Sequence, residues 1–558
     1  MGKEIIIGLK NCKIDREFHA KSGSFLADVL RQNGIAVSLS CGGNGRCGKC
    51  RAVFADGAPM PNSFDEKFLS KEELAVGKRL LCRCIVTDDC SVEIDGAVSD
   101  ESMKVELTGA YSDGNAAAQI AGVYDSNGSS SCCVPDNKRV NEGKHISESA
   151  EKKYKEYAIV VDIGTTTLAA AILGMRRDGH GEHADVIMTR GMANPQRRFG
   201  ADVITRIDAA SETEDRESLE NTLRQSIRDL VKELMSEVGA KRAEVVVITG
   251  NTTMLHFFAG EDTKGLGRFP YTPVFTDGKE IDPEVVFGEA LSGTVILMPG
   301  ISAFVGADIV SGLYFLDVIS SKKSVLMADI GTNGELAFWD GHKLSVTSTA
   351  AGPVFEGGNI SFGMASVPGA IDHVKINSGG AISFSVIGSI KPLGICGSGV
   401  IDIISELIRC GFVDETGLLA ERYFDAGFPV DDSNRIFFTQ QDIRQVQLAK
   451  GAIYSGIKAI TGGEVPDRVY LAGGFGSSID SDKIKNIRMF PDGFSGKIVL
   501  AGNTALAGAV RYAGDILLGQ ERKKTADECL YNIREKAQVT ELARSDGFDE
   551  DYISSMNF

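Results

Sequence analysis

The sequence predicts a multidomain α/β protein with a small cysteine-rich unit at its N-terminus and two similar lobes in its larger C-terminal part. Three observations support this fold class. At 558 residues the chain is longer than one hydrophobic core usually organises. Seven of its twelve cysteines fall in the first 90 residues. Beyond residue 156, strand-like and helix-like segments alternate, and an Asp-Ile-Gly-Thr sequence at Asp162 is repeated at Asp329.

These patterns divide the chain into three segments. Residues 1–98 form the cysteine-rich unit, and residues 156–558 form the two-lobed part. Residues 99–155 are too polar to bury much apolar area, so we expect a flexible linker there. Within the first segment, strands are expected over Glu4–Leu9 and Ser91–Ile94 and a short helix over Ser24–Gln32.

Composition and charge exclude several classes of protein. Hydrophobic residues make up 43% of the chain and charged residues 24%, as in ordinary globular proteins. A net charge of −17 argues against a partner bound through nucleic-acid phosphates, which require a basic surface. No apolar run reaches the roughly 18–20 residues that span a bilayer, and Met1–Ile7 lacks the features of a signal peptide. We therefore expect a cytoplasmic protein whose cysteines are reduced and serve metal or redox chemistry.

The cysteine-rich unit carries the pattern of an iron–sulfur site. Cys41, Cys47 and Cys50 follow a C-x5-C-x2-C spacing in a glycine-rich loop, and Cys82 lies further along the chain. A close trio of thiolates with one distant partner is how ferredoxins hold a 2Fe–2S cluster, and glycines let backbone N–H groups approach the sulfurs. The alternatives are a zinc site built from the pairs Cys47/Cys50 and Cys82/Cys84, and a redox-active dithiol. The zinc site leaves Cys41 and the glycines without a role.

Residues 1–98 resemble the β-grasp ferredoxins. The resemblance implies a 2Fe–2S cluster on Cys41, Cys47, Cys50 and Cys82, and the Arg-Leu-Leu-Cys sequence that ends at Cys82 favours this residue over Cys84 as the fourth ligand. The first gap is one residue longer than in the plant-type spacing, as in ferredoxin variants with a five-residue gap. No dinucleotide or flavin motif accompanies the unit, so its electron must come from another reductant.

Three glycine-containing strand ends in the larger part predict a nucleotide site. No G-x-x-x-x-G-K-[ST] sequence occurs, which excludes a P-loop enzyme. Instead, Asp162–Thr167 and Asp329–Glu335 each place an aspartate and a glycine after a strand, where backbone amides and hydroxyls can hold phosphate oxygens. Leu471–Gly476 ends a third strand with a surface poor in side chains, which suits a purine and ribose. Any one of these alone could be a plain hairpin or the start of a helix.

The predicted site residues follow from these three segments. Asp162 and Asp329 are the expected catalytic groups, which handle the water shell of Mg²⁺ and polarise water, and the sequence does not separate these roles. The predicted nucleotide contacts are Gly164, Thr165, Thr166, Thr167, Gly331, Thr332, Asn333, Gly334, Gly473, Gly474, Phe475 and Gly476.

In this order the segments resemble the ribonuclease-H-like ATPase superfamily of actin, heat-shock chaperones and sugar kinases. The resemblance implies two lobes that clamp the phosphates of ATP from both sides and close over them. It also implies connecting helices at Phe304–Leu313 and Gly502–Ala509, where small residues allow close packing at the hinge. Closing and opening of the lobes would then transmit work to the attached redox unit.

The whole chain resembles the reductive activators of corrinoid proteins. Besides the segments above, the resemblance rests on Asn194–Val203, Gly250–Met254, Ala351–Gly357 and Gly394–Gly399. In that family, ATP-driven one-electron reduction returns inactive Co(II) corrinoid to the methyl-accepting Co(I) state. The resemblance therefore implies a corrinoid-protein partner in a methyltransferase or O-demethylase system, a low-potential electron donor, and a homodimer.

Two other functions remain open from the sequence. The chain could reduce a different low-potential protein acceptor with the energy of ATP, by analogy with activators of dehydratases and aryl-CoA reductases, which usually carry no ferredoxin unit. It could also be a redox-sensing module whose ATP-gated lobes bind a partner without delivering an electron.

Several conspicuous residues have plain structural explanations. Glu356 and Asn251 either support the nucleotide site or form turns. Packing or hydrogen-bonding roles are expected for Cys396, Cys410, His256 and Trp339. The stripe of Leu219, Leu223, Ile227, Leu230 and Leu234 is expected to face the core from one helix.

Overall fold

The computed structural model describes most of the chain. The described residues are 3–10, 15–33, 35–36, 45, 48, 50–94, 98–99, 124–125, 154–178, 181–200, 202–211, 213–377, 379–431, 433, 435–473, 479–494, 498–545 and 547–558. Five residues that were assigned to the sites from the sequence lie outside the described residues: Cys41, Cys47, Gly474, Phe475 and Gly476.

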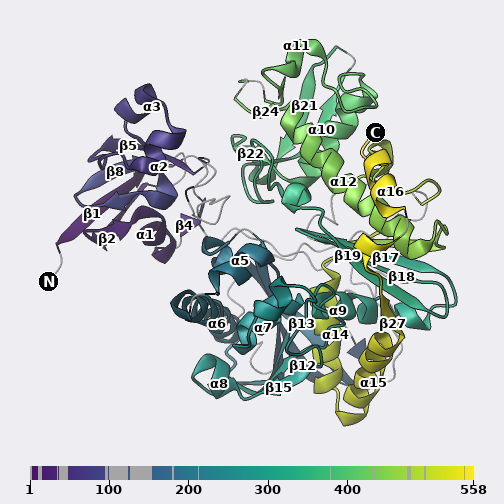
Figure 1. Ribbon diagram of the computed structural model, residues 1–558. Coiled ribbons are helices and arrows are strands. Elements are labelled where there is room, and N and C mark those ends of the chain that lie inside the picture. The colour runs from purple at the N-terminus through teal and green to yellow at the C-terminus, as the bar shows by residue number, and fades with distance from the viewer. Residues whose placement is uncertain are drawn as a thin grey trace.

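The N-terminal unit is built on a five-stranded mixed sheet with strand order β2-β1-β8-β5-β6 (Figure 1). β1 pairs antiparallel with β2 and parallel with β8. Ile5, Ile7 and Leu9 of β1 are fully buried, because successive side chains of a strand point to opposite faces. The strands are β1 (Glu4–Lys10), β2 (Asp15–Lys21), β5 (Arg51–Asp56), β6 (Lys78–Leu80) and β8 (Cys90–Glu93).

Short helices and minor strands complete this unit. The predicted helix begins two residues later than expected, because Ser24–Phe25 forms β3 and pairs with β7 (Ile85–Val86). Helix α1 (Leu26–Gln32) then contributes Leu26 and Leu30 to the core. The remaining elements are β4 (Ile35–Ala36), α2 (Ser63–Phe68), α3 (Lys71–Ala75), the 3-10 turn η1 (Leu81–Arg83) and β9 (Val98–Ser99).

The first lobe carries a seven-stranded sheet with strand order β10-β13-β12-β11-β14-β16-β15. Two residues of the predicted flexible linker, Tyr124–Asp125, form the edge strand β10 and pair with Ala184 and His183 of β13. The free backbone groups at the edge of a sheet explain this pairing. The other strands are β11 (Glu156–Ile163), β12 (Thr167–Asp178), β13 (Gly181–Ala193), β14 (Ala243–Gly250), β15 (Lys279–Ile281) and β16 (Ser292–Leu297).

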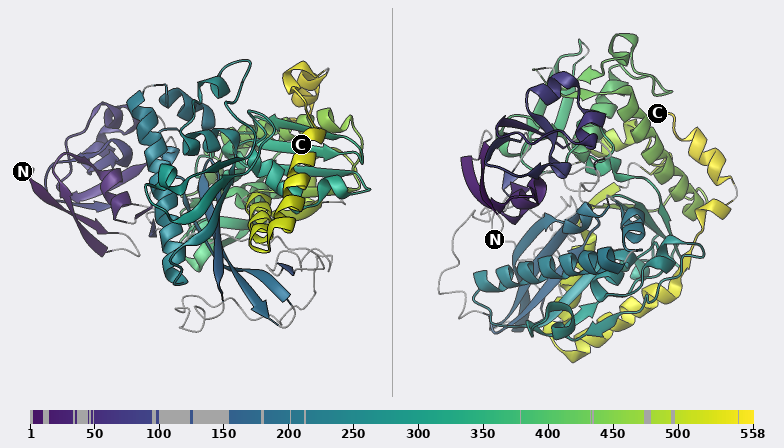
Figure 2. Two further views of the ribbon diagram at one scale, coloured as in Figure 1. Left: turned by 90° about the horizontal axis from the view of Figure 1, so that it is seen from below. Right: turned by 60° about the vertical axis from the view of Figure 1, so that its left-hand side comes forward.

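Helices cover both faces of this sheet. Helix α6 (Thr213–Glu237) lies along one face, and the C-terminal helices α14 (Thr504–Leu517) and α15 (Gln520–Lys536) lie on the other side (Figure 2). The predicted leucine and isoleucine stripe of α6 is confirmed as core, since all five of its residues are buried. The smaller helices of the lobe are α5 (Val203–Ala209), α7 (Thr252–Ala259), α8 (Pro283–Phe287) and α9 (Ala307–Phe315).

The second lobe repeats the plan of the first. In each lobe an antiparallel three-stranded meander, β11-β12-β13 or β17-β18-β19, is followed by two strands parallel to its first member, β14 and β16 or β25 and β26. This shared topology confirms the repeat that the two Asp-Ile-Gly-Thr sequences predicted. The strands are β17 (Val325–Ile330), β18 (Gly334–Trp339), β19 (Leu344–Thr349), β25 (Arg468–Ala472), β26 (Ile498–Gly502) and β27 (Ala537–Val539).

A smaller sheet and several helices complete the second lobe. Helix α10 (Gly397–Arg409) packs on the sheet of β20 (Ala370–Ile376), β21 (Ile382–Val386) and β22 (Gly394–Ile395), at the end of the lobe shown at the top of Figure 1. Helix α12 (Gln440–Thr461) packs against β18, β19 and α16 (Phe548–Ser554). Also present are α11 (Glu421–Phe424), α13 (Ser481–Asn486), β23 (Phe428–Pro429) and β24 (Phe437–Phe438).

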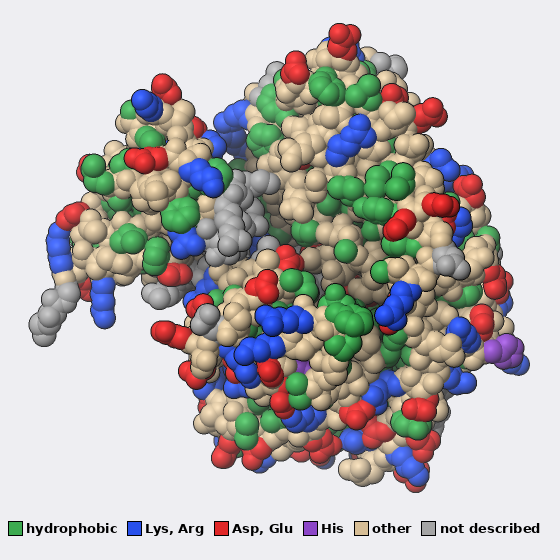
Figure 3. All heavy atoms as spheres, viewed as in Figure 1, with side chains coloured by type: hydrophobic (Ala, Val, Ile, Leu, Met, Phe, Trp, Pro, Cys, Tyr) green, Lys and Arg blue, Asp and Glu red, His purple; other side chains and the backbone are tan. Residues whose placement is uncertain are grey.

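On the face shown in Figure 3, Lys and Arg side chains are mixed with Asp and Glu and form no continuous basic stripe. None of the helices in the described part of the chain has the length and apolar character needed to cross a membrane.

Helices α9 and α14 cross in close contact at the centre of the two-lobed part (Figure 1). A Cβ atom at Gly508 of α14 would lie 1.9 Å from the Ser311 carbonyl oxygen of α9. One at Gly312 of α9 would lie 2.4 Å from Met327 Cε. The predicted close packing of small residues at this hinge is therefore confirmed.

We expect Gly508→Ala to destabilise the protein by about 1–3 kcal/mol, because its methyl group would press on a backbone carbonyl that cannot move aside. The midpoint of thermal or urea unfolding measures the effect. Gly8→Ala is the control, since the nearest atom to its Cβ would be 3.8 Å away. An unchanged midpoint for Gly508→Ala would show that the two helices are not locked together.

Candidate functional site

The first of the two predicted phosphate-binding segments, Asp162–Thr167, is the tight turn between β11 and β12, and it is called the first phosphate loop below. Asp162 and Ile163 pair with Ala169 and Leu168, which leaves only a few residues for the turn. A Cβ at Gly164 would lie 2.7 Å from the Thr167 carbonyl oxygen, so this position requires glycine.

Two asparagines that begin neighbouring elements hold this loop from outside. Asn194 Nδ2 donates to the Gly164 carbonyl at 2.7 Å, and Asn251 Nδ2 donates to Thr165 Oγ1 at 3.0 Å. Each side chain also accepts from a backbone N–H at the start of its own helical turn, Gln196 N for Asn194 and Met254 N for Asn251. Asn251 therefore caps a helix and also contacts the first loop. The sequence had offered a structural turn and a contact with the site as alternatives for this residue.

A buried arginine lies behind the first phosphate loop. Arg206 is fully buried, and its guanidinium donates to the Thr165 carbonyl at 2.6 Å and the Gly200 carbonyl at 3.0 Å. Its third acceptor is the Met254 sulfur at 3.4 Å. Burial lowers the pKa of Arg206 to about 9, because the charged form loses its hydration.

The second phosphate loop, between β17 and β18, has the same construction. Asp329 pairs with Glu335 and Ile330 with Gly334, and Gly331 N–H donates across the turn to the Asn333 carbonyl at 2.9 Å. The turn is therefore closed by its own backbone hydrogen bonds.

Glu356 joins the two loops. Its Oε2 accepts a hydrogen bond from Thr332 Oγ1 at 2.6 Å and another from Thr166 Oγ1 at 3.2 Å. Glu356 is the last residue of the 3-10 turn η6 (Pro353–Glu356), so the turn and the contact with the site, which the sequence offered as alternatives, are both present.

Four carboxyl groups gather at the ends of the strands that carry these loops. Burial raises the pKa of Asp162 to about 7, with a smaller contribution from the nearby Asp308. Burial raises the pKa of Asp329 to about 8, helped by Asp308 and Asp162. Burial likewise raises the pKa of Asp308 to about 6, and burial, Asp308 and Asp329 raise that of Glu335.

This carboxyl cluster fits a hydrated Mg²⁺ ion. A cation would offset the repulsion between the carboxylates, and the adjacent loops offer amides and hydroxyls for phosphates. No three His, Cys, Asp or Glu side chains of the described residues are close enough to hold a metal directly. Magnesium keeps several of its waters, so the ion would bind Asp162 and Asp329 mainly through its water shell.

The end of β25 closes the site from the second lobe. Gly473 has φ +113°, and a Cβ there would lie 2.4 Å from the Ile330 carbonyl oxygen and 3.2 Å from Asp329 Oδ1. One residue after β26, Asn503 Nδ2 donates to Asp162 Oδ2 at 2.9 Å. The third predicted segment therefore lies directly beside the second phosphate loop, as far as Gly473.

Four residues of this site were given no individual role from the sequence, although Glu335 ends the predicted segment Asp329–Glu335: Arg206, Asp308, Glu335 and Asn503. Asp308 stands in the first turn of α9, in a segment that was predicted only as a connecting helix. The signal for Asp308 in the sequence was Gly306-Ala307-Asp308. A Cβ at Gly306 would lie 2.6 Å from Asn251 Cα, so the small residues let the start of α9 approach the segment that holds the first loop.

Two of the four predicted cluster ligands are described, and they lie at the same end of the ferredoxin-type sheet. Cys50 directly precedes β5 and Cys82 lies in η1, and each is 7% exposed. Leu81 N–H donates to the Cys50 carbonyl at 2.7 Å, which joins the two segments. Cys84 is buried at the end of the same turn, and burial raises the pKa of its thiol to about 12.

The described glycines of the cysteine loop fit a tightly wound cluster site. Gly45 and Gly48 have φ +67° and +65°. Cβ atoms there would lie 2.7 Å from the Phe64 ring and 2.9 Å from the Phe68 side chain. Both positions therefore require glycine, and the loop is held against α2.

A buried aspartate connects α2 to the segment that carries Cys82. Asp65 is fully buried, and its two oxygens accept from Leu80 N–H at 2.7 Å and Asn62 N–H at 3.0 Å. Its carboxylate therefore fixes η1 relative to the helix that supports the cysteine loop.

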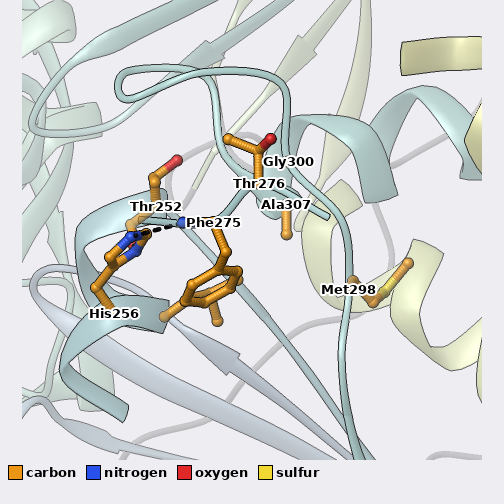
Figure 4. A pocket seen from close by; sticks show the side chains of 8 residues that line it. Thr252, His256, Phe275, Thr276, Met298, Gly300 and Ala307 are labelled. Atoms are coloured by element: carbon orange, nitrogen blue, oxygen red, sulfur yellow. Dashed lines mark hydrogen bonds between the residues drawn. The ribbon is translucent and has the colours of Figure 1, made fainter. Parts of the chain in front are cut away.

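The expected structural roles of four other residues are supported by their contacts. His256 hydrogen-bonds through Nδ1 to the Thr252 carbonyl at 2.7 Å, and its Nε2 accepts from Val274 N–H at 3.0 Å. It stacks on Phe275 at a small pocket beside α7 (Figure 4).

The other three residues belong to the second lobe. Cys396 and Cys410 hydrogen-bond to the Ile371 and Ile376 carbonyls, and Trp339 is 3% exposed.

The fold and these two sites define an iron–sulfur protein in which a ferredoxin-type domain is joined to a two-lobed ATPase. Residues 10–87 match the 2Fe-2S iron-sulfur cluster binding domain, residues 157–321 the RACo middle region, and residues 323–558 the C-terminal domain of RACo, the ASKHA domain. The chain is 30% identical to the corrinoid activation enzyme RamQ of Eubacterium limosum, with 98% of each chain covered. It belongs to the family of reductive activators of corrinoid proteins.

Two further similarities agree with this family. The chain is 25% identical to the [Co(II) methylated amine-specific corrinoid protein] reductase of Methanosarcina barkeri, over 72% of this chain and 77% of the relative. A solved reductive activator for corrinoid, iron–sulfur protein superposes with a TM-score of 0.64 at 25% identity, over 99% of this chain and 98% of the other. The predicted fold class and the predicted cofactors, a 2Fe–2S cluster, ATP and Mg²⁺, are confirmed.

We expect Asp65→Asn to weaken the ferredoxin-type domain by about 1–3 kcal/mol, because one of two buried N–H groups would face an amide N–H instead of an oxygen. Thermal unfolding and the retention of cluster absorbance during incubation measure the loss. Glu66→Gln, an exposed change on the same helix, is the matched control. Equal behaviour of the two variants would contradict a role for Asp65 in fixing the cluster segment.

We expect Asp329→Asn to stabilise the nucleotide-free protein, and more at pH 9 than at pH 6. Its folded-state pKa of about 8 lies above the ordinary value of 3.8, so the wild-type carboxyl contributes most when protonated and loses that stability as the pH rises toward 8. Unfolding midpoints at the two pH values measure the gain.

Asp340→Asn is the control for this pH effect. The backbone N–H of Lys343 lowers the pKa of the Asp340 carboxyl. Replacing this carboxylate by an amide should therefore destabilise the folded protein at high pH. A gain for Asp329→Asn that does not grow with pH would mean that Asp329 does not lose stability on ionising.

Proposed function

We propose that this chain delivers one electron, in an ATP-dependent step, to the cobalt of a partner corrinoid protein and so returns Co(II) to Co(I). The observation that carries the proposal is the match over 98% of the chain to a corrinoid activation enzyme, together with both sites required for the reaction. The electron leaves a reduced 2Fe–2S cluster, which becomes oxidised, and the cobalt is reduced by one.

The need for ATP follows from the energetics of one-electron transfer. For one electron, about 59 mV corresponds to about 1.4 kcal/mol. Delivery across a gap of a few tenths of a volt therefore requires several kcal/mol from a coupled reaction. Closing of the two lobes over nucleotide is the motion that this fold supplies.

We assign the residues of the two sites as follows. Thiolates of Cys41, Cys47, Cys50 and Cys82 would hold the cluster, which supplies the one-electron chemistry. Asp162 and Asp329 would orient the Mg²⁺ waters and the attacking water. The two hairpins would hold the phosphates through Gly164–Thr167 and Gly331–Gly334, and Gly473–Gly476 would lie against the adenosine. Among the described residues, the two hairpins follow β11 and β17, and Gly473 follows β25 beside the second hairpin, which supports the nucleotide assignments.

The physiological setting is also a proposal. We propose a low-potential electron donor, because the chain carries no dinucleotide or flavin motif of its own. We propose a homodimer, as the family resemblance implies, and a location in the cytoplasm, where cysteine thiolates stay reduced. Sedimentation equilibrium of the anaerobic protein tests the dimer.

The reduction is tested optically under anaerobic conditions. The pre-reduced protein is mixed with a Co(II) corrinoid protein, and the Co(I) absorption band is followed with and without Mg·ATP. We expect Co(I) only with Mg·ATP, and at least a tenfold slower formation in Cys47→Ser and Asp329→Ala, which remove a cluster ligand and a carboxylate of the nucleotide site.

His342→Ala, an exposed change in the loop after β18, is the control and should keep the wild-type rate. If several Co(II) corrinoid proteins remain unreduced while ATP is hydrolysed, the acceptor is a different protein. If Co(I) forms equally fast without ATP, the coupling of the two domains is contradicted.

A further inference from the structure

Glu356 occupies the place that an anionic ligand of both loops would need. One oxygen, Oε2, accepts from the hydroxyls of Thr332 and Thr166, at 2.6 Å and 3.2 Å. These are the hydroxyls expected to contact the phosphates. A threonine hydroxyl has a single proton to donate, so it cannot serve the Glu356 carboxylate and a phosphate oxygen at once.

Charges of both signs lie near Glu356. Arg206 lies behind the first loop, and its acceptors among the described residues are two carbonyls and a thioether, so no carboxylate neutralises it by direct contact. Glu356 is one of the acidic groups whose charge raises the pKa of Arg206. It also raises the pKa of Asp329, because two negative charges repel each other.

We propose that Glu356 is a built-in stand-in for the terminal phosphate of ATP: it bridges Thr166 and Thr332 in the nucleotide-free protein, and nucleotide binding displaces it. The inference rests on the proposed ATPase function and adds the residue through which the lobes sense the phosphate. Glu356 acts through the two threonines and is a positioning residue.

The turn that carries Glu356 is packed tightly against a helix of the same lobe. This turn, η6, lies against the start of α10, where a Cβ at Gly397 would lie 1.7 Å from the Phe355 carbonyl oxygen. Helix α10 in turn holds β20, because Asp402 accepts from Val374 N–H at 3.0 Å and Glu406 from Ile376 N–H at 2.8 Å. If loss of the bridge moves η6, these contacts would pass the movement to α10 and the β20–β22 sheet.

The decisive variant is Glu356→Gln in the full-length protein. The amide keeps the shape of the side chain, but its hydrogen bonds to the hydroxyls are weaker than those of a carboxylate and it does not repel phosphate. We expect Mg·ATP to bind about tenfold more tightly, while AMP, which lacks the terminal phosphates, binds as before. The exposed Glu421→Gln on the same lobe is the matched control.

Calorimetric titration with Mg·ATP and with AMP gives both affinities. A gain confined to Mg·ATP, absent from Glu421→Gln, supports the stand-in role. Equal affinities in wild type and Glu356→Gln would overturn it. Weaker Mg·ATP binding in the variant would also overturn it, because Glu356 would then be a ligand of the Mg·ATP complex.

A second measurement needs no variant and covers the case in which Glu356→Gln does not fold. Hydrogen exchange of the wild-type protein is compared with and without Mg·ATP. The inference expects altered protection at residues 353–376, and unchanged protection there in a protein that binds nucleotide would contradict it. Wild-type protein that binds no Mg·ATP would instead remove the proposed ATPase function, and the inference with it.

Discussion

The carboxyl groups of Asp162, Asp308, Asp329 and Glu335 share the space where the two lobes meet, and the rest of the site is arranged around their repulsion. Burial raises the pKa of all four, and like charges add to this for Asp162, Asp329 and Glu335. Such a cluster is unfavourable without a cation and persists because the surrounding strands fix it. A hydrated Mg²⁺ ion with bound phosphates would restore the charge balance. Nucleotide binding therefore depends on the charge of this carboxyl cluster.

Helices α9 and α14 both contribute residues to the carboxyl cluster or its hydrogen bonds. Helix α9 carries Asp308 into the carboxyl cluster, and the residue that precedes α14, Asn503, donates to Asp162. The two helices touch at Ser311 and Gly508 with no space for a methyl group. Because neither helix can slide freely past the other, we expect a change of charge at the cluster to act on both helices together.

The sequence was sufficient where structure is local. The two hairpins were predicted from an aspartate, a glycine and a following threonine, and the helix stripe of α6 from its periodicity, because these features depend on neighbours in the chain. Asp308, Arg206 and the bridging role of Glu356 depend on contacts between distant segments, which no local pattern encodes. The helix start at Leu26 and the strand at Tyr124–Asp125 were missed for the same reason, since each is set by pairing with a distant strand.

The central claim is that ATP controls the passage of one electron from the cluster to cobalt. Rapid mixing of the pre-reduced protein with a Co(II) corrinoid protein, while cluster oxidation and Co(I) formation are recorded together, tests it most directly. The account predicts that both signals appear at the same rate, one cluster oxidised per cobalt reduced, and only when Mg·ATP is present. Cluster oxidation at the same rate without ATP, or without matching Co(I), would contradict it.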